Sequence, residues 1–268
     1  MNRKLLFFDI DGTLLCGKLP GYIPESALDA LRRAQDKGHY VFINTGRTWA
    51  YLPQAVKDYL FDGYICGCGT YIRFHDEVLY HHRIPDDIRM SLPGLLKDCR
   101  LQGVLEGTGA MYADRKVDPF PPIQMVCDAY KVYSNDTAKD FDDEDLLFEK
   151  FVIIGDSSGD ADLFRRESSH YFESFGPIDL GGWFFEEFVP SACSKATGID
   201  RIIDHLGLST DDCCVFGDGV NDVSMMNHVR YSIAMGNGAW EAMEAATYVT
   251  TPANRDGIRN GMLHYHLI

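Results

Sequence analysis

Short apolar runs alternate with helical segments near the start of this 268-residue chain. The run that begins at Leu5 reads as a buried strand, and the segments YVFIN (40–44) and GYICG (63–67) read as two more. Pro24 suits the first turn of a helix between the first two strands, and Gly38 suits its end. A second, less regular helical segment separates the last two. This alternation predicts βαβ units and therefore a parallel sheet.

The same alternation returns near the C-terminal end. Ser194 is a good N-cap for a helix whose isoleucines recur at helical spacing, and Gly207 is a good stop. Strands are expected at CCVFGD (213–218), YSIAMG (231–236) and YVT (248–250), and helices at DVSMMNHV (222–229) and WEAMEAA (240–246). Two α/β segments thus flank a middle region, and we expect them to form one Rossmann-like parallel sheet.

The middle region, residues 84–187, has a different pattern. Its strand candidates are GAMYA (109–113), KFVIIG (150–155), HYFESFG (170–176) and GWFFEEFV (182–189), and DFDDEDLLFEK (140–150) is an acidic helix candidate. Strands separated by helices in this way predict an inserted α+β domain with a mostly antiparallel sheet. We therefore expect a core built from residues 1–83 and 188–268 and an inserted domain at 84–187.

Composition limits the classes of protein and partner. Apolar residues make up 46% and charged residues 24%, as in ordinary globular proteins, and the net charge is −15. That charge argues against nucleic acid as a partner, because phosphate backbones are held by clusters of Lys and Arg. The chain shows neither a leader-like start nor a long apolar run, so we expect a cytoplasmic protein that does not enter a membrane, with its eight cysteines as reduced thiols.

The segment DIDGT (9–13) is the sharpest chemical signal. Asp9 and Asp11 stand two residues apart at the end of a buried strand, so both carboxylates point to the same side of an extended backbone. One could attack phosphorus while the other protonates the leaving oxygen and later activates water. The alternative is structural: Asp11 could simply close an Asx turn before Gly12.

Other polar groups follow other predicted strands and helix starts. The Thr45 hydroxyl and the backbone N–H groups after it could hold phosphate oxygens. Lys195 lies in the first turn of its helix, where the helix dipole disfavours a cation, and a bound anion would explain it better than a solvated surface lysine. Asp218, Asn221 and Asp222 offer the hard oxygen ligands that Mg²⁺ prefers.

Taken together, these motifs resemble the haloacid dehalogenase (HAD) superfamily, and within it the Cof-like phosphatases. The four motifs appear in order as Asp9–Thr13, Thr45–Arg47, Lys195 and Gly217–Asp222, and the segments IAMGN (233–237) and NRDGI (254–258) fit the same branch. The resemblance covers the core, whereas residues 84–187 match only in position, size and class. It implies the HAD fold and an inserted C2-type cap, of the C2B subtype.

The resemblance also implies a role for each motif residue. Asp9 would be the nucleophile and Asp11 the general acid and base. The implied phosphate-binding residues are Thr45, Gly46, Lys195 and Asn221. The implied Mg²⁺ ligands are Asp9, Asp11 (through its carbonyl oxygen), Asp218 and Asp222. Mg²⁺ and Lys195 would then supply the positive charge that an anionic substrate needs in so acidic a chain.

A second Gly-Asp segment, VIIGDSSGDADLF (152–164), repeats the spacing of the 215–226 segment. Asp156 and Asp160 match Asp218 and Asp222 in separation, but they lie inside the predicted insert and before Lys195. We interpret them as turn and N-cap residues at the start of a helix.

These observations predict a Mg²⁺-dependent phosphatase that hydrolyses a small phosphorylated metabolite, such as a sugar phosphate or a phosphorylated cofactor, through an aspartyl-phosphate. Two alternatives stay open: a phosphomutase that uses the same intermediate, and a non-catalytic ligand-binding protein. Since the interval between Arg47 and Lys195 is far longer than one βα unit needs, the cap is expected there, where it would exclude water and read the leaving group.

Overall fold

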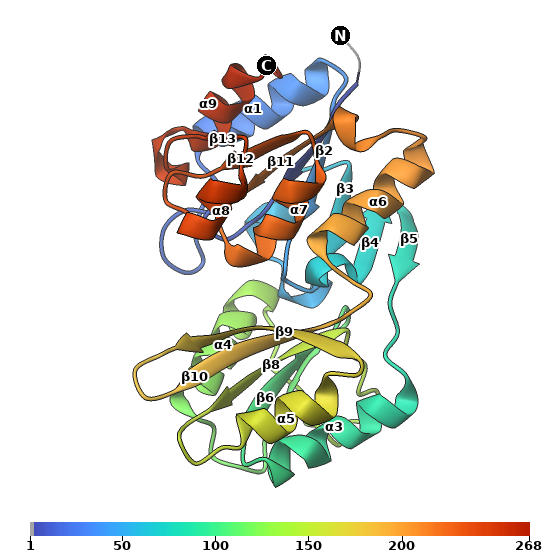
Figure 1. Ribbon diagram of the computed structural model, residues 1–268, viewed down its shortest axis with the longest axis vertical. Helices are drawn as coiled ribbons and strands as arrows, with labels where there is room; N and C mark the ends of the chain where they lie inside the picture. Colours follow the sequence, from blue (N-terminus) through green and yellow to red (C-terminus); the bar gives the residue numbers. More distant parts are fainter. Residues whose placement is uncertain (1–2) are drawn as a thin grey trace. The chain divides into compact units, whose positions relative to one another are not determined.

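The computed structural model describes residues 3–268, which form two compact units (Figure 1). The first unit comprises the described residues up to Gly46 together with Ala55–Tyr80 and Ser194–Ile268. The second comprises Arg47–Gln54 and His81–Cys193. None of the helices within residues 3–268 is long and apolar enough to cross a membrane.

The first unit is built on an eight-stranded sheet with the order β13-β12-β11-β1-β2-β3-β4-β5. The strands are β1 (Leu5–Phe8), β2 (Tyr40–Asn44), β3 (Gly63–Cys66), β4 (Tyr71–Phe74), β5 (Glu77–His81), β11 (Cys213–Gly217), β12 (Tyr231–Ala234) and β13 (Tyr248–Val249). All pairs from β13 to β3 are parallel, and β4 runs antiparallel to β3. The predicted parallel sheet is therefore confirmed.

Helices cover both faces of this sheet (Figure 1). They are α1 (Glu25–Asp36), α2 (Gln54–Lys57), α6 (Lys195–Leu206), α7 (Val223–His228), α8 (Trp240–Ala245) and α9 (Gly257–His264). On one face Phe7 belongs to a core cluster with Ile199 of α6. On the other, Phe8 stacks on Phe216, and α9 approaches that ring at Gly261. Because successive residues of β1 are buried on opposite faces, the strand reads as one continuous apolar run.

The start and end of α6 follow the predicted caps. The Ser194 side chain accepts the backbone N–H of Thr197, whose hydroxyl in turn accepts the backbone N–H of Ser194. Gly207 ends the helix in the left-handed conformation, with φ of 64°. The capping box places Lys195 at the first helical position.

The second unit contains a five-stranded antiparallel sheet with the order β7-β6-β8-β10-β9. Its strands are β6 (Gln102–Glu106), β7 (Met111–Ala113), β8 (Lys150–Gly155), β9 (Phe172–Asp179) and β10 (Phe184–Pro190), and its helices are α3 (Asp86–Asp98), α4 (Pro121–Ser134) and α5 (Ala161–Ser168). Leu96 of α3 and Phe164 of α5 pack with Phe151, whereas Ile123 of α4 packs with Val152 on the opposite face. The molecule thus has the predicted α/β class, with a parallel core sheet and a separate antiparallel sheet.

One sequence-based expectation was wrong, and another was confirmed only in part. The acidic segment 140–150 forms turns instead of a helix, because the side chains of Asp140 and Asp143 accept the backbone N–H groups of Asp142 and Asp145. Such Asx bonds compete with helical hydrogen bonding. The helical segment expected between the second and third strands is shorter than a regular helix: it consists of a 3-10 turn at Trp49–Tyr51 and the short α2, which begins directly after Pro53.

Candidate active site

Three polar residues follow three neighbouring parallel strands of the first unit. Asp9 follows β1, Thr45 follows β2 and Asp218 follows β11, and β1 pairs with the other two. The backbone N–H of Asp9 continues the ladder by donating to Phe216 (2.9 Å). Parallel strands present their carboxyl ends at one edge of a sheet, so these residues lie along the same edge.

Lys195 lies between two carboxylates. Its Nζ is 2.5 Å from Asp9 Oδ1 and 2.5 Å from Asp222 Oδ1, and the residue is only 1% exposed. Asn44 Nδ2 donates to the Lys195 carbonyl oxygen (3.0 Å) and so anchors the first turn of α6. A cation at a helix N-terminus is unfavourable by itself. Here the protein's own carboxylates compensate it, a pairing that the sequence did not reveal.

The ionisation of these groups reflects their burial and their proximity. Burial raises the pKa of the Asp9 carboxyl well above its ordinary value; Lys195 opposes that rise, and Asp222 and Asp11 add to it. Burial by itself would lower the pKa of Lys195, but Asp222 and Asp9 raise it above its ordinary value. Burial also raises the pKa of Asp218 to about 6. Lys195 alone therefore does not offset the cost of ionising all of these carboxyl groups.

The acidic cluster has the donor chemistry of a divalent-cation site. One carboxylate oxygen from each of Asp9, Asp218 and Asp222 lies within 4.8 Å of the others. Clustered hard oxygen donors suit Mg²⁺, and a second positive charge would offset the burial that raises the pKa of Asp9 and Asp218 and the smaller repulsion that adds to it. The residues present thus fit the predicted metal.

Asp222 has its oxygens engaged within the protein. Oδ2 accepts the backbone N–H groups of Asp218 and Gly219 (both 2.8 Å), Oδ1 faces Lys195, and the residue is 0% exposed. Asn221, next to it in the loop, is half-buried. Asp222 therefore holds the loop after β11 and the lysine in place, and its role as a direct metal ligand stays a prediction.

The loop after β1 approaches Asp218 closely. Gly12 has φ of +78°, and a Cβ there would come within 2.1 Å of Asp218 Oδ2. Thr13 Oγ1 donates to Asp218 Oδ1 (2.8 Å), and Asn237 Nδ2 donates to the Gly12 carbonyl oxygen (2.8 Å). Only glycine fits this position. The positioning roles of Thr13 and Asn237 were missed from the sequence, although both belong to motifs noted there.

The remaining predicted residues also lie in the first unit. Thr45 is buried, its N–H donates to Ile65, and its carbonyl oxygen accepts the N–H of Cys68. Gly46 follows it and is half-buried. Asp11 is exposed and close enough to Asp9 to raise its pKa. The structure therefore groups every predicted site residue in one unit.

The second Gly-Asp segment is structural, as predicted. Asp156 Oδ1 accepts both the backbone N–H (2.8 Å) and the hydroxyl (2.6 Å) of Ser158. Asp160 is the N-cap of α5 and accepts the backbone N–H of Leu163 (2.9 Å). Both residues belong to the second unit. The repeated spacing is thus a coincidence of turn chemistry.

The sequence pattern of the family described as haloacid dehalogenase-like hydrolase matches residues 6–262 of this chain. The chain belongs to this family. Among its relatives is a Bacillus subtilis protein named "Putative phosphatase YkrA", which is 28% identical over 260 residues that cover 96% of each chain. The 5-amino-6-(5-phospho-D-ribitylamino)uracil phosphatase YitU of Bacillus subtilis is 26% identical over 273 residues and 97% of each chain.

Solved structures of HAD-like proteins share the whole fold. A structure described as the HAD subclass IIB sugar phosphatase BT4131 superposes with a TM-score of 0.82 at 28% identity, covering 99% of this chain and 100% of that one. The predicted fold class is confirmed, and the protein is a hydrolase of the phosphatase type.

Proposed function

We propose that this HAD-like hydrolase is a Mg²⁺-dependent phosphatase that cleaves a small organic phosphomonoester through an aspartyl-phosphate at Asp9. The observation that carries the proposal is the position of Lys195, buried between Asp9 and Asp222 beside a cluster of acidic oxygens. Burying a lysine between a strand-end carboxylate and a second loop carries a desolvation cost. Buried ionised groups of this kind are concentrated at functional sites, where they orient a reacting group.

In the first half-reaction, an Asp9 carboxylate oxygen attacks phosphorus while the bond from phosphorus to the leaving oxygen breaks. Asp11, in its protonated form, gives its proton to the leaving oxygen, which departs as an alcohol. Lys195 fixes Asp9 through Oδ1. Thr45 and the N–H of Gly46, with Asn221, would bind oxygens of the transferring group.

In the second half-reaction, the Asp11 carboxylate takes a proton from water as the water oxygen attacks phosphorus. The bond from Asp9 to phosphorus breaks, inorganic phosphate leaves, and both aspartates return to their starting states. Asp11 thus acts first as an acid and then as a base. This role requires a carboxyl group that lies near the reacting atoms and does not form an ion pair with Lys195.

A bound Mg²⁺ would be held by Asp9, the Asp11 carbonyl oxygen and Asp218, with Asp222 orienting the loop, and would supply electrostatic stabilisation of the transferring phosphoryl group. Thr13 and Asn237 would keep Asp218 and the loop after β1 in place for that purpose.

We further propose that residues 84–187 act as a C2-type cap that determines which leaving group is accepted, while residues 1–83 and 188–268 carry the chemistry. Support comes from the unit division of the chain and from its likeness to the sugar phosphatase of HAD subclass IIB. By that likeness, a sugar phosphate is the first substrate class to test, followed by phosphorylated cofactors.

The test is phosphate release from p-nitrophenyl phosphate with and without Mg²⁺, for the wild type, Asp9→Asn and Asp156→Asn. Asp156 is the matched control, because it shares the Gly-Asp context but only closes a turn. We expect metal-dependent turnover that falls at least about a thousandfold in Asp9→Asn. Asp156→Asn should keep the wild-type rate.

Turnover that persists in Asp9→Asn would refute the nucleophile assignment. Equal loss in both variants would show that the effect is not specific to the site. If p-nitrophenyl phosphate is not turned over by the wild type, a panel of sugar phosphates is assayed in the same way, and absence of Mg²⁺-dependent release from all of them would overturn the proposed activity.

A further inference from the structure

A hollow of about 440 Å³ opens on the second unit beside α3 and α4. We call it the α3 hollow. It is lined by the C-terminal half of α3, the start of β6, and the segment from Asp114 to Phe120 that joins β7 to α4. All of its lining residues belong to the second unit, whereas the residues proposed for catalysis all belong to the first. Its volume is in the range of small-molecule sites.

The floor of the α3 hollow is apolar. Leu96, Leu101 and Ile123 are buried, and Phe120 and Phe141 are half-buried and complete the wall. Gly103 lines the same floor, where an added Cβ would lie only 3.0 Å from Leu96. A mostly apolar wall with a few polar groups at the edge is the usual composition of a site for an organic ligand.

The charged residues of the α3 hollow are mainly cations. Lys97, Arg100 and Lys116 line it together with a single carboxylate, that of Asp114. Lys116 is neutralised by Asp142, which lies 2.6 Å from its Nζ, and by Asp140 at 4.0 Å. Within residues 3–268, no carboxylate is within ion-pair distance of Lys97 or Arg100. These two cations stand out in a chain of net charge −15, and they complement an anion.

The edge of the hollow is held in place by the protein itself. Arg100 follows α3 with φ of 55°, a left-handed conformation that glycine or asparagine usually takes, and its Nε donates to the Ser158 carbonyl oxygen (2.7 Å). The Gln102 side chain donates to the Asp118 carbonyl oxygen and accepts the N–H of Phe120. These hydrogen bonds hold the wall and the guanidinium in position, which lowers the entropic cost of binding.

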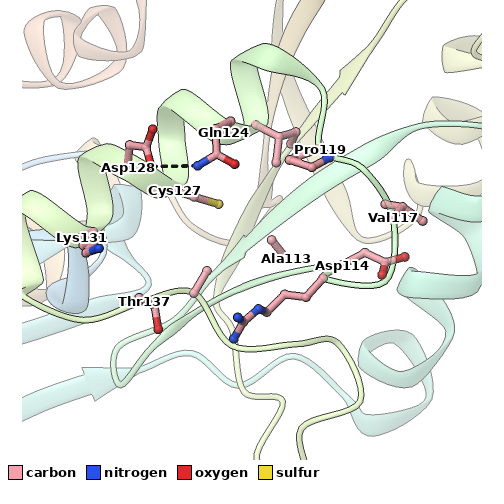
Figure 2. Close-up of a pocket in the computed structure, with 12 residues that line it drawn as sticks. Ala113, Asp114, Val117, Pro119, Gln124, Cys127, Asp128, Lys131 and Thr137 are labelled. Atoms are coloured by element: carbon pink, nitrogen blue, oxygen red, sulfur yellow. Dashed lines mark hydrogen bonds between the residues drawn. The ribbon is translucent and has the colours of Figure 1, made fainter.

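An adjoining hollow of about 350 Å³ makes a useful contrast (Figure 2). It shares Asp114, Val117 and Ile123 with the α3 hollow. Its two cations, Arg115 and Lys131, are matched by two carboxylates, and Figure 2 shows Gln124 donating to one of these, Asp128. With its charges balanced, this second hollow has no preference for an anion.

We propose that the α3 hollow is a second ligand site, which binds a small aromatic molecule bearing one anionic group. The ring would lie against Leu101 and Phe120, and the anionic group would face Lys97 and Arg100. This proposal is independent of the proposed catalytic function, because no residue of the hollow takes part in that reaction.

The probe is 1-naphthoate, an aromatic carboxylate, and its neutral counterpart is 1-naphthamide. Binding to the full-length protein is measured by isothermal titration calorimetry for the wild type, Arg100→Gly, Lys97→Ala and Lys131→Ala. Arg100→Gly removes the guanidinium while placing the preferred residue at a left-handed position, so the fold is retained. Lys131→Ala removes the same charge from the adjoining hollow.

We expect saturable binding of 1-naphthoate with Kd below about 1 mM, and weaker binding of 1-naphthamide. Arg100→Gly should weaken the binding of 1-naphthoate about tenfold, and Lys97→Ala should weaken it as well, because each removes a charge-assisted contact. Lys131→Ala should leave it unchanged. The proposal is overturned if 1-naphthoate does not bind saturably, if Arg100→Gly and Lys97→Ala bind it like the wild type, or if Lys131→Ala weakens it equally.

Discussion

The glycine at position 198 lies in the interior of α6, three residues after Lys195. Judged from helix propensity alone, Gly198→Ala should stabilise the protein by about 0.5–1 kcal/mol. The tertiary structure predicts the opposite sign. A Cβ at this position would lie 2.5 Å from Ile65 Cγ2 and 3.5 Å from Gly69 Cα.

The contact with Ile65 cannot be relieved by a simple rotation. Ile65 is fully buried in β3, and its Cγ2 belongs to a β-branched side chain with little freedom at χ1. The helix must therefore move, and overpacking of this kind costs about 1–3 kcal/mol. Because the gain in helix propensity offsets part of this cost, the free energy of unfolding should fall by about 1 kcal/mol.

Gly94 provides the matched control. It also lies inside a helix, α3, but an added Cβ there would meet nothing within 4 Å. Gly94→Ala should therefore stabilise its helix by about 0.5–1 kcal/mol. Urea unfolding followed by circular dichroism measures both changes, and hydrogen exchange of peptides from α6 and α3 assigns each change to its unit.

Movement of α6 would also displace Lys195 from Asp9, so Gly198→Ala should lower kcat about ten- to a hundredfold. The control Gly94→Ala should leave kcat unchanged. A Gly198→Ala variant as stable as the wild type or more stable, or a Gly94→Ala variant destabilised to the same degree, would show that close packing against Ile65 does not exclude a side chain at position 198.

Three further predictions concern ionisable groups. Lys195→Met leaves two buried carboxylates without their cation, so it should destabilise the protein by about 3 kcal/mol in urea unfolding and abolish turnover; wild-type stability would contradict this. Mg²⁺ at a hundred times its Kd should stabilise the wild type by about 2.7 kcal/mol, which thermal melts measure without substrate. Asp218→Asn should abolish this stabilisation, and an unchanged shift in melting temperature would argue against Asp218 as a ligand. Burial, with nearby lysines, lowers the pKa of His39, whose Nδ1 accepts the N–H of Lys4, so the contribution of His39 to stability should decrease as pH falls below about 6.5, and the wild type should lose stability relative to His39→Asn. His39→Asn keeps an acceptor and removes that decrease, and unfolding free energies measured between pH 7 and 5 would show an identical slope if the assignment were wrong.

Local patterns were sufficient to predict most elements of the first unit. Apolar runs buried on both faces indicated β1, β2 and β11, and Ser194 and Gly207 marked the ends of α6, because caps and strand burial depend on residues close together in sequence. The same reasoning failed at residues 140–150, where side-chain bonds of Asp140 and Asp143 to nearby backbone replaced the helix. It also missed β4 and β5, and β6 among the strands of the insert.

Local hydrophobic patterns are enough to predict which chemistry-bearing residues follow which strands. The pairing of Lys195 with Asp9, 186 residues away, and the close approach of Gly12 to Asp218 become visible only in the folded chain. The same is true of the grouping of Arg47–Gln54 with the second unit. Such pairings depend on strand order and on how closely helices pack against the sheet. Both are set by contacts between residues far apart in the chain, so a short stretch of sequence does not reveal them.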